Sequence, residues 1–428
     1  MEEEGRSIVS PVLEKPIIQK QFDDLNKIVE EAQKRVDYTV AHDEEVIKAI
    51  ETVERFLRKK KRVCYGGQAI NALLPKSHKF YDPDYTIPDY DFFSPSVGED
   101  IDEIIEMLQE EGFTDVNKKV GVHEGTMKVY VNFVPVADCS ELHPRLFKIV
   151  QKRAHTIDGI LYCDPDFLRM MMYLELSRPR GEVSRWKKVF ERLTLLNYSY
   201  PPGECNDYVK VNKNVMYDDR KIILDFIVKN KRVLAGSEVI ELLSRGKDKV
   251  NTEKLIQFGG PVIFLTKDAS NDANDLKDIL GGVKVDKYEV ETDTLFPFTT
   301  LSRGTTKIAI ILQEEACHGY LNIHLSSGSD MRLATPDTLL HLYYSFLIFG
   351  RKEKSFFQTS LECLIQKIHT VAKKAREFPT SFLPAFGLKC SGHQKGIATL
   401  LKAKAARTEK EKKVLKSGKN KTKKVKKN

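Results

Sequence analysis

Two carboxylates separated by one residue are the side chains of this chain best suited to chemistry. Asp89 and Asp91 flank Tyr90 and lead into the apolar pair Phe92 and Phe93. Because side chains alternate along a strand, the two carboxylates are expected on one face and Tyr90 on the other. Carboxylates held side by side repel each other and therefore favour a divalent cation between them. The pattern predicts a site for Mg²⁺ or Mn²⁺.

A pair of glycines lies upstream of these acids. Gly66 and Gly67 fall in segment 62–71, whose sequence predicts a strand, a tight turn and the start of a helix. Glycine lets a phosphate approach the backbone, and the free N–H groups at a helix start attract anions. A Gly-Gly turn alone is a weak signal, and so is an Asp-x-Asp motif alone. Together, metal-binding acids and a phosphate cradle predict phosphoryl or nucleotidyl transfer.

Two further Asp-x-Asp motifs, at 82–84 and 164–166, have proline at the middle position. Proline removes a backbone donor and favours turns over central strands. Asp164 and Asp166 also stand where a helix begins, so they are interpreted as a helix cap and a first-turn acid. Only the pair at 89 and 91 leads into apolar residues that could anchor it in a sheet.

Size and composition fit a globular protein with two or three domains. The chain has 428 residues, of which 41% are hydrophobic and 30% charged, and this length can bury sizeable cores. Its acidic N-terminus is not a signal peptide, and no apolar stretch is long enough to span a membrane. Seven cysteines without a Cys-x-x-Cys pair predict reduced thiols in an intracellular protein. The segment 390–393 resembles half of a zinc site but has no matching half, so no zinc is expected there.

The net charge of +8 is concentrated at one end of the chain. Residues 402–428 contain 13 Lys or Arg and two Glu, so this segment carries +11 and the remainder −3. Such a tail cannot bury a core and is expected to be disordered. It is either a solubilising or nuclear-import-like run, or a tether for RNA phosphates whose strength falls with salt. The RNA-binding candidates are Lys416, Lys419, Lys421, Lys423 and Lys424.

The fold class predicted is mixed α/β (α+β). Five segments are expected: an N-terminal arm at 1–44, a catalytic domain at 45–198, a second domain at 199–345, a helical segment at 346–405 and a disordered lysine-rich tail at 406–428. Residues 43–60 carry apolar side chains at helical spacing, and 164–195 are also expected to be helical. The run Tyr200-Pro201-Pro202-Gly203 is interpreted as a domain boundary.

The second half partly repeats the first. A shift of 170 residues places the pattern of 56–66 on 226–236, and a shift of 179 places 125–128 on 304–307. Two matches in the same order predict a duplicated unit. The strand expected at 262–268 keeps at most one acid, and the second shift places Asp138 opposite Cys317. The second copy is therefore predicted to be a scaffold, and the contrast nominates Asp138 as the third metal ligand.

The combination of strand, Gly-Gly turn, helix, Asp-x-Asp and a later acid resembles the polymerase-β-type nucleotidyltransferase signature. The stretch from Gly67 to Asp89 is longer than in minimal members of that superfamily, which requires an insertion at 75–88. The motifs at 66–71, 123–126, 158–162 and 174–181, with the degenerate second copy, resemble the poly(A) polymerases of large cytoplasmic DNA viruses, mimivirus-type enzymes in particular. The resemblance covers residues 40–350 and is strongest in 60–195. It implies a nucleotidyltransferase fold with a mixed sheet flanked by helices, followed by a degenerate nucleotidyltransferase-like domain.

The resemblance further implies a polynucleotide adenylyltransferase that adds AMP from ATP to an RNA 3′ end by two-metal chemistry. Asp89, Asp91 and Asp138 would be the catalytic, metal-holding acids, with Mg²⁺ or Mn²⁺ as cofactor. Gly66 and Gly67 would contact the triphosphate through backbone N–H groups. Arg178, Lys187 and Lys188 are the basic residues expected to bind the nucleotide. A homodimer located in the host cytoplasm, the viral factory or the virion is also implied.

Alternatives stay open at this point. The same fold could support terminal uridylylation, or oligoadenylate or cyclic-dinucleotide synthesis. A chain of a different class would be a non-catalytic RNA-binding or processivity subunit. The intact acids of the first copy argue against that class, because the second copy shows what such decay looks like.

Overall fold

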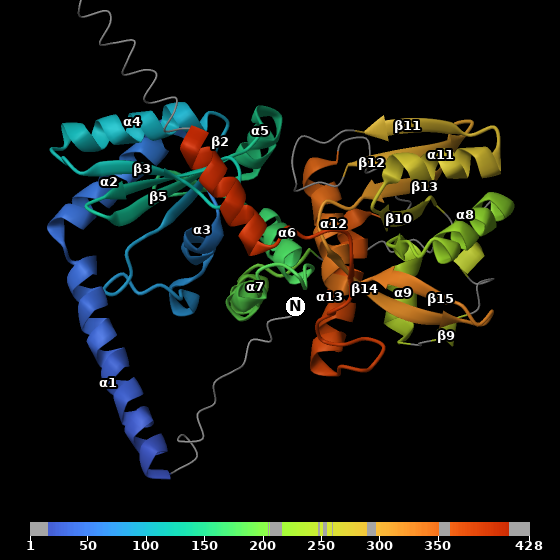
Figure 1. Cartoon of the computed structure of the whole chain (residues 1–428), viewed down its shortest axis with the longest axis horizontal. Coiled ribbons are helices and arrows are strands. Elements are labelled where there is room, and N and C mark those ends of the chain that lie inside the picture. The colour runs from blue at the N-terminus through green and yellow to red at the C-terminus, as the bar shows by residue number, and fades with distance from the viewer. Residues whose placement is uncertain are drawn as a thin grey trace, which may run out of the picture.

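The computed structural model describes residues 16–203, 205, 216–246, 249–250, 255–258, 260–288, 297–350 and 360–410. Within these ranges the chain forms two mixed sheets, each flanked by helices, and the two halves lie side by side (Figure 1). The α/β (α+β) class expected from the sequence is confirmed. No helix among the described residues is long and apolar enough to cross a membrane.

The first half is built on a seven-stranded sheet in the order β3-β4-β5-β2-β1-β7-β6. Its strands are β1 (Val63–Cys64), β2 (Tyr90–Ser94), β3 (Val116–Val120), β4 (Thr126–Val131), β5 (Val134–Glu141), β6 (His155–Ile157) and β7 (Ile160–Tyr162). β2 runs parallel to β5 and antiparallel to β1, while β1 runs parallel to β7. This arrangement puts β2, the strand after the Gly-Gly helix, in the middle of the sheet.

The helices of this half are α1 (Pro16–Ala41), α2 (Glu44–Lys60), α3 (Gly66–Leu73), α4 (Val97–Glu110), α5 (Pro144–Arg153), α6 (Pro165–Leu176) and α7 (Trp186–Ser199). Asp43 caps α2, as its side chain accepts from two backbone N–H groups of the first turn. The apolar face of α2, including Val53, Phe56 and Leu57, is fully buried. Asp164 caps α6 in the same way, as expected. The single helix expected over 164–195 is instead two helices, because Pro179 and Gly181 interrupt it.

The second half repeats the first sheet strand for strand. It contains β8 (Val233–Leu234), β9 (Lys249–Val250), β10 (Val262–Thr266), β11 (Lys284–Tyr288), β12 (Phe298–Arg303), β13 (Thr306–Gln313), β14 (His318–Leu325), β15 (Asp330–Ala334) and β16 (Cys390–Ser391). Its order, β11-β12-β13-β10-β8-β15-β14-β16, matches that of the first sheet with β16 added at the edge, and β9 additionally pairs with β14. β10 is parallel to β13 and antiparallel to β8, as β2 is to β5 and β1. The internal duplication is therefore a property of the fold.

The pairing registers correct one of the two sequence shifts. Val63 pairs with Phe93 as Val233 pairs with Leu265, so the shift of 170 holds at β1. The shift of 179 is wrong: it places Thr126, the start of β4, near Thr306, which begins β13, the counterpart of β5. In the true register, Ile263 pairs with Ile310 where Asp91 pairs with Asp138. Asp138 therefore corresponds to Ile310 and not to Cys317, and the second copy lacks both acids.

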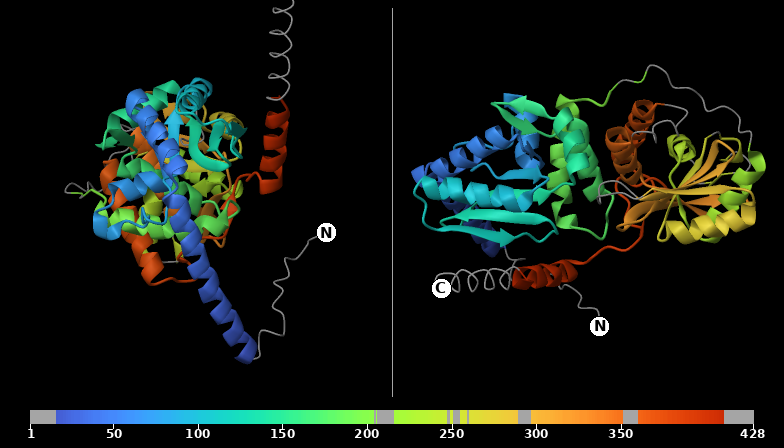
Figure 2. Two further views of the ribbon diagram at one scale, coloured as in Figure 1. Left: turned by 90° about the vertical axis from the view of Figure 1, so that its left-hand side faces the viewer. Right: turned by 90° about the horizontal axis from the view of Figure 1, so that it is seen from above.

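The helices of the second half are α8 (Tyr217–Lys229), α9 (Ser237–Arg245), α11 (Ala269–Leu280), α12 (Pro336–Phe349) and α13 (Leu361–Glu377). α6 and its counterpart α12 pack against each other at the centre of the molecule (Figures 1 and 2). His341 on α12 contacts the Met170 carbonyl, and His369 on α13 lies between the hydroxyls of Tyr173 and Tyr344. Every residue of α12 is buried, so the two halves share one core.

The end of the chain returns from the second half to the first. After α13, β16 joins the edge of β14, and residues 397–410 form a helix whose Arg407 donates to the Gly121 and Val122 carbonyls. Figure 2 shows this helix beside the first half. The boundary expected at 405/406 falls inside it, so 406–410 are helical and not disordered. The five lysines expected to bind RNA lie outside the described residues.

The cysteines depart from expectation. Disulfides join Cys205 to Cys363 and Cys317 to Cys390, so the prediction of seven reduced thiols is wrong for these four. Cys64, Cys139 and Cys163 are free and buried. Spacing along the chain could not show these pairs, because each joins segments that only the fold brings together.

Candidate active site

The Gly-Gly turn lies directly beside Asp91. Gly66 begins α3 with a φ of +72°, a conformation that L side chains rarely adopt. A Cβ on Gly66 would lie 2.5 Å from Oδ2 of Asp91. Tyr65, at the N-cap position, provides no side-chain hydrogen bond to the helix start. The first turn of α3 therefore presents backbone N–H groups beside a carboxylate.

Three aspartates meet next to this turn. Asp91 on β2 is directly paired with Asp138 on the parallel strand β5, and Asp89 immediately precedes β2. Tyr90 is buried, and its hydroxyl donates to Glu54 of α2, 2.7 Å away. The structure thus brings together the three residues expected to be catalytic.

The crowding of these acids shows in their titration. Burial, followed by the charges of Asp89 and Asp138, raises the pKa of Asp91 to about 7. Partial loss of solvation and the charge of Asp138 also raise the pKa of Asp89. Asp138 is only 7% exposed, and its Oδ1 has no hydrogen-bond partner among the described residues. Three mutually repelling carboxylates, one with a buried unpartnered oxygen, are a donor set suited to hard divalent cations.

Helix α7 supplies positive charge on the side facing the acids. The positive charge of Arg185 lowers the pKa of Asp91 and that of Lys188 lowers the pKa of Asp89, in each case against the larger effect of burial. Arg192 lies one turn beyond Lys188. The neighbouring Arg192, followed by desolvation and Arg185, lowers the pKa of Lys188, whereas Asp89 acts in the opposite direction. Spacings of three and four residues put these cations on one face of the helix. That spacing was readable in the sequence, but without the fold it did not say which face meets the acids.

Two of the basic residues expected at the nucleotide site are less well placed. Lys187 is exposed and takes no part in the charge interactions of Asp89 or Asp91. The positive charge of Arg178 lowers the pKa values of Glu175, His318 and His341. Because these side chains come from both halves, Arg178 belongs to the contact between them. Of the three, only Lys188 has a described electrostatic link to the aspartates.

The inserted segment at 75–88 contributes two groups that sequence reasoning missed. Asn71 of α3 accepts from the backbone N–H groups of Phe80 and Tyr81, which fixes the insertion on the Gly-Gly helix. The Arg192 guanidinium lies 4.8 Å from the Phe80 ring centroid and donates to the Tyr81 hydroxyl at 2.7 Å. A Cβ on Gly67 would approach that hydroxyl to 2.5 Å and Arg192 Nη1 to 2.7 Å. Arg192 and Tyr81 therefore lie over the second glycine.

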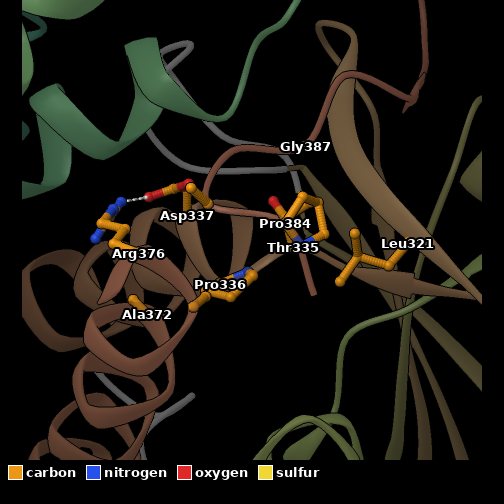
Figure 3. A pocket seen from close by; sticks show the side chains of 10 residues that line it. Leu321, Thr335, Pro336, Asp337, Ala372, Arg376, Pro384 and Gly387 are labelled. Carbon is orange, nitrogen blue, oxygen red and sulfur yellow. Dashed lines mark hydrogen bonds and ion pairs between the residues drawn. The ribbon is translucent and has the colours of Figure 1, made fainter. Parts of the chain in front are cut away.

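Among the described residues, no group of three or more His, Cys, Asp or Glu side chains is arranged so that it could hold a metal ion. At the aspartates, Lys128 of β4 lies opposite Asp138 in the sheet and its Nζ forms an ion pair with Asp138 Oδ2. A described pocket lies away from the aspartates, around the buried ion pair of Asp337 and Arg376 (Figure 3). It belongs to the contact between α12, α13 and the returning C-terminal segment.

The segment that contains the three aspartates resembles known proteins. Residues 51–182, which hold the Gly-Gly turn and all three aspartates, match the family described as poly(A) polymerase catalytic subunit. The resemblance to the viral poly(A) polymerases is confirmed. A protein of African swine fever virus (strain Badajoz 1971 Vero-adapted) named as a poly(A) polymerase catalytic subunit is 37% identical over 177 residues, covering 40% of this chain and 36% of that protein. A protein of Acanthamoeba polyphaga mimivirus with the same name is 27% identical over 286 residues, covering 60% of this chain and 48% of that protein.

The fold has a close solved counterpart. The crystal structure of the Megavirus polyadenylate synthase superposes with a TM-score of 0.75 at 18% identity, covering 93% of this chain and 84% of that one. The nucleotidyltransferase-like fold expected from the sequence is thus confirmed for both halves. The matched regions span only about a third to a half of the two viral relatives.

Proposed function

We propose that this chain is a template-independent poly(A) polymerase that transfers AMP from ATP to the 3′ end of RNA. The observation that carries the proposal is the meeting of Asp89, Asp91 and Asp138 beside the Gly66 turn, within the segment that matches the catalytic-subunit family. The second half, which has Ile263 and Ile310 at the acid positions, acts as a scaffold. The domain limits given above are part of this proposal, with the helix at 397–410 kept as one unit.

Asp89, Asp91 and Asp138 would hold the divalent cations, Mg²⁺ or Mn²⁺. When bound, such ions polarise the triphosphate and the RNA 3′-hydroxyl for in-line displacement. The reaction joins the 3′-oxygen to the α-phosphorus and breaks the bond to the β-phosphate, so pyrophosphate leaves. This chemistry needs no protein nucleophile.

The remaining residues bind and orient the triphosphate. The backbone N–H groups at Gly66 and Gly67 would contact the phosphates, and a Cβ at either residue would collide with Asp91 or with Tyr81 and Arg192. Lys188 and Arg192 balance the phosphate charge, and the Tyr81 hydroxyl keeps Arg192 over Gly67. Arg185 balances Asp91 from the start of the same helix.

RNA is the proposed second substrate, and the lysines at 416, 419, 421, 423 and 424 would hold its backbone. A homodimer in the host cytoplasm, viral factory or virion remains part of the proposal, supported by the resemblance alone. Arg407 docks the helix at 397–410 on the turn between β3 and β4, so the basic tail starts from the catalytic half.

Incorporation of labelled ATP and UTP into an oligo(A) primer, with Mg²⁺ or Mn²⁺, tests the proposal. We expect ATP-dependent extension that Asp89→Ala or Asp91→Ala lowers roughly a thousandfold or more, with the unfolding transition retained. Extension with UTP instead would identify a uridylyltransferase, and primer-independent products an oligoadenylate or cyclic-dinucleotide synthase. An Asp89→Ala, Asp91→Ala double variant that still extends the primer would reject the site.

A further inference from the structure

Lys128 stands where a cation would be needed in the acid cluster. It lies on β4 directly opposite Asp138, and its Nζ contacts Asp138 Oδ2. The lysine side chain is 32% exposed, whereas the Asp138 side chain is only 10% exposed. The Lys128 ammonium also lowers the pKa values of Asp89 and Asp91, so its positive charge affects all three carboxylates.

The second oxygen of Asp138 indicates that this ion pair is incomplete. Oδ1 is buried and has no hydrogen-bond partner among the described residues. A buried carboxylate oxygen without a donor is costly unless something else binds there. One oxygen of Asp138 is thus held by a lysine, and the other is available for a ligand.

The duplicated half provides an internal comparison. In the second half, the positions of Lys128 and Asp138 are taken by Thr300 and Ile310, which also pair across neighbouring strands. The lysine and the acid are thus absent together in the half that lacks the site. This fits a lysine that serves the carboxylates, because a lysine needed only for packing of the strand would not depend on them.

We infer that Lys128 is the resident counter-ion of Asp138 and competes with a divalent cation for that carboxylate. The inference rests on the proposed function and deepens it. Before substrate arrives, the ammonium neutralises Asp138 and weakens ion binding there. The triphosphate of an incoming nucleotide offers Lys128 another anionic partner, so ion binding at Asp138 becomes coupled to nucleotide binding.

Titration of Mn²⁺ by electron paramagnetic resonance, without nucleotide or RNA, tests this role. We expect Lys128→Met to bind Mn²⁺ about tenfold more tightly than the unchanged chain, a difference of about 1.4 kcal/mol. Lys118→Met is the matched control, because Lys118 is 30% exposed and also pairs with an aspartate, Asp102, outside the site. The control should change Mn²⁺ affinity less than twofold.

A double-mutant cycle separates specific pairing from a general charge effect. In an Asp138→Asn background, Lys128→Met should change Mn²⁺ affinity less than twofold, because the contested carboxylate is gone.

Mn²⁺ should also raise the unfolding temperature of Lys128→Met more than that of the unchanged chain. Equal or weaker Mn²⁺ binding by Lys128→Met, or an undiminished effect in the Asp138→Asn background, would overturn the inference. Failure of primer extension would leave these binding results intact, so the two proposals fail separately.

Discussion

Asp91 is the residue on which the most constraints converge. Its Oδ2 fills the space that a side chain on Gly66 would need, and its strand position pairs it with Asp138. Burial and two neighbouring carboxylates hold its pKa at about 7. A carboxyl group whose pKa is this high in the absence of a cation has a negative charge that the protein alone does not balance.

The elevated pKa of Asp91 makes the metal-free protein less stable at high pH. Asp91 favours the folded state while it is protonated, and this contribution is lost as the pH rises from about 4 through about 7. We expect Asp91→Asn to be more stable than the unchanged chain at pH 8 by about 2 kcal/mol, and the gap to narrow at pH 5.5. Urea unfolding in EDTA at the two pH values measures this. Saturating Mn²⁺ should reverse the order at pH 8, whereas a variant less stable at both pH values in EDTA would contradict the account.

At the scale of elements, α7 links the three aspartates to the rest of the molecule. One face carries Lys188 and Arg192 toward the acids and Gly67, while Val189 and Leu193 are buried. Trp186 and Phe190 pack against Phe386 of the returning C-terminal segment. The returning C-terminal segment therefore helps to hold α7, the helix that we propose balances the triphosphate charge.

Two adjacent lysines on α7 should differ sharply in function. Lys188→Met should raise the KM for ATP about tenfold with a smaller change in kcat, because it removes a phosphate contact worth about 1.4 kcal/mol. Lys187→Met, on a different face of the helix, should change KM less than twofold. Initial rates over a range of ATP concentrations give both constants. Equal effects of the two substitutions would mean that α7 is turned differently from the arrangement described.

At the scale of the whole molecule, two similar halves are joined through equivalent helices. α6 and α12 form the centre, with His341 buried on α12 and His369 partly buried beside them. Burial lowers the pKa of His341 and of His369 to about 3, so both are neutral in the folded protein. The contact between the halves is thereby sensitive to acid.

This acid sensitivity can be measured at the contact between the two halves. The unfolded chain protonates these histidines below about pH 6.5 while the folded chain does not, so stability falls as the pH drops toward 3. Between pH 8 and pH 5, His369→Gln should lose about 2 kcal/mol less stability than the unchanged chain. The fluorescence of Trp186, the single tryptophan, follows unfolding next to the joint. Equal slopes for His369→Gln and the unchanged chain would refute the role of His369.

Much of the fold was predictable because its signals are local. The apolar spacing of α2, the cap Asp164, and the motif at 56–66 that recurs at 226–236 each depend on neighbouring residues. The 179-residue shift failed because β-strands of similar composition can be aligned in several registers. The prediction of reduced thiols failed for a related reason, since Cys205 and Cys363 meet only once the chain has folded.

The amino-acid sequence by itself determined which carboxylates and which glycines could serve nucleotidyl transfer, because residue type and short-range spacing fix chemistry and local conformation. Tertiary structure alone decided that Asp138 stands beside Asp91, that Lys128 pairs with Asp138, and that Arg192 rather than Arg178 lies over Gly67. These choices depend on strand order and helix orientation, which result from packing between residues far apart in the chain.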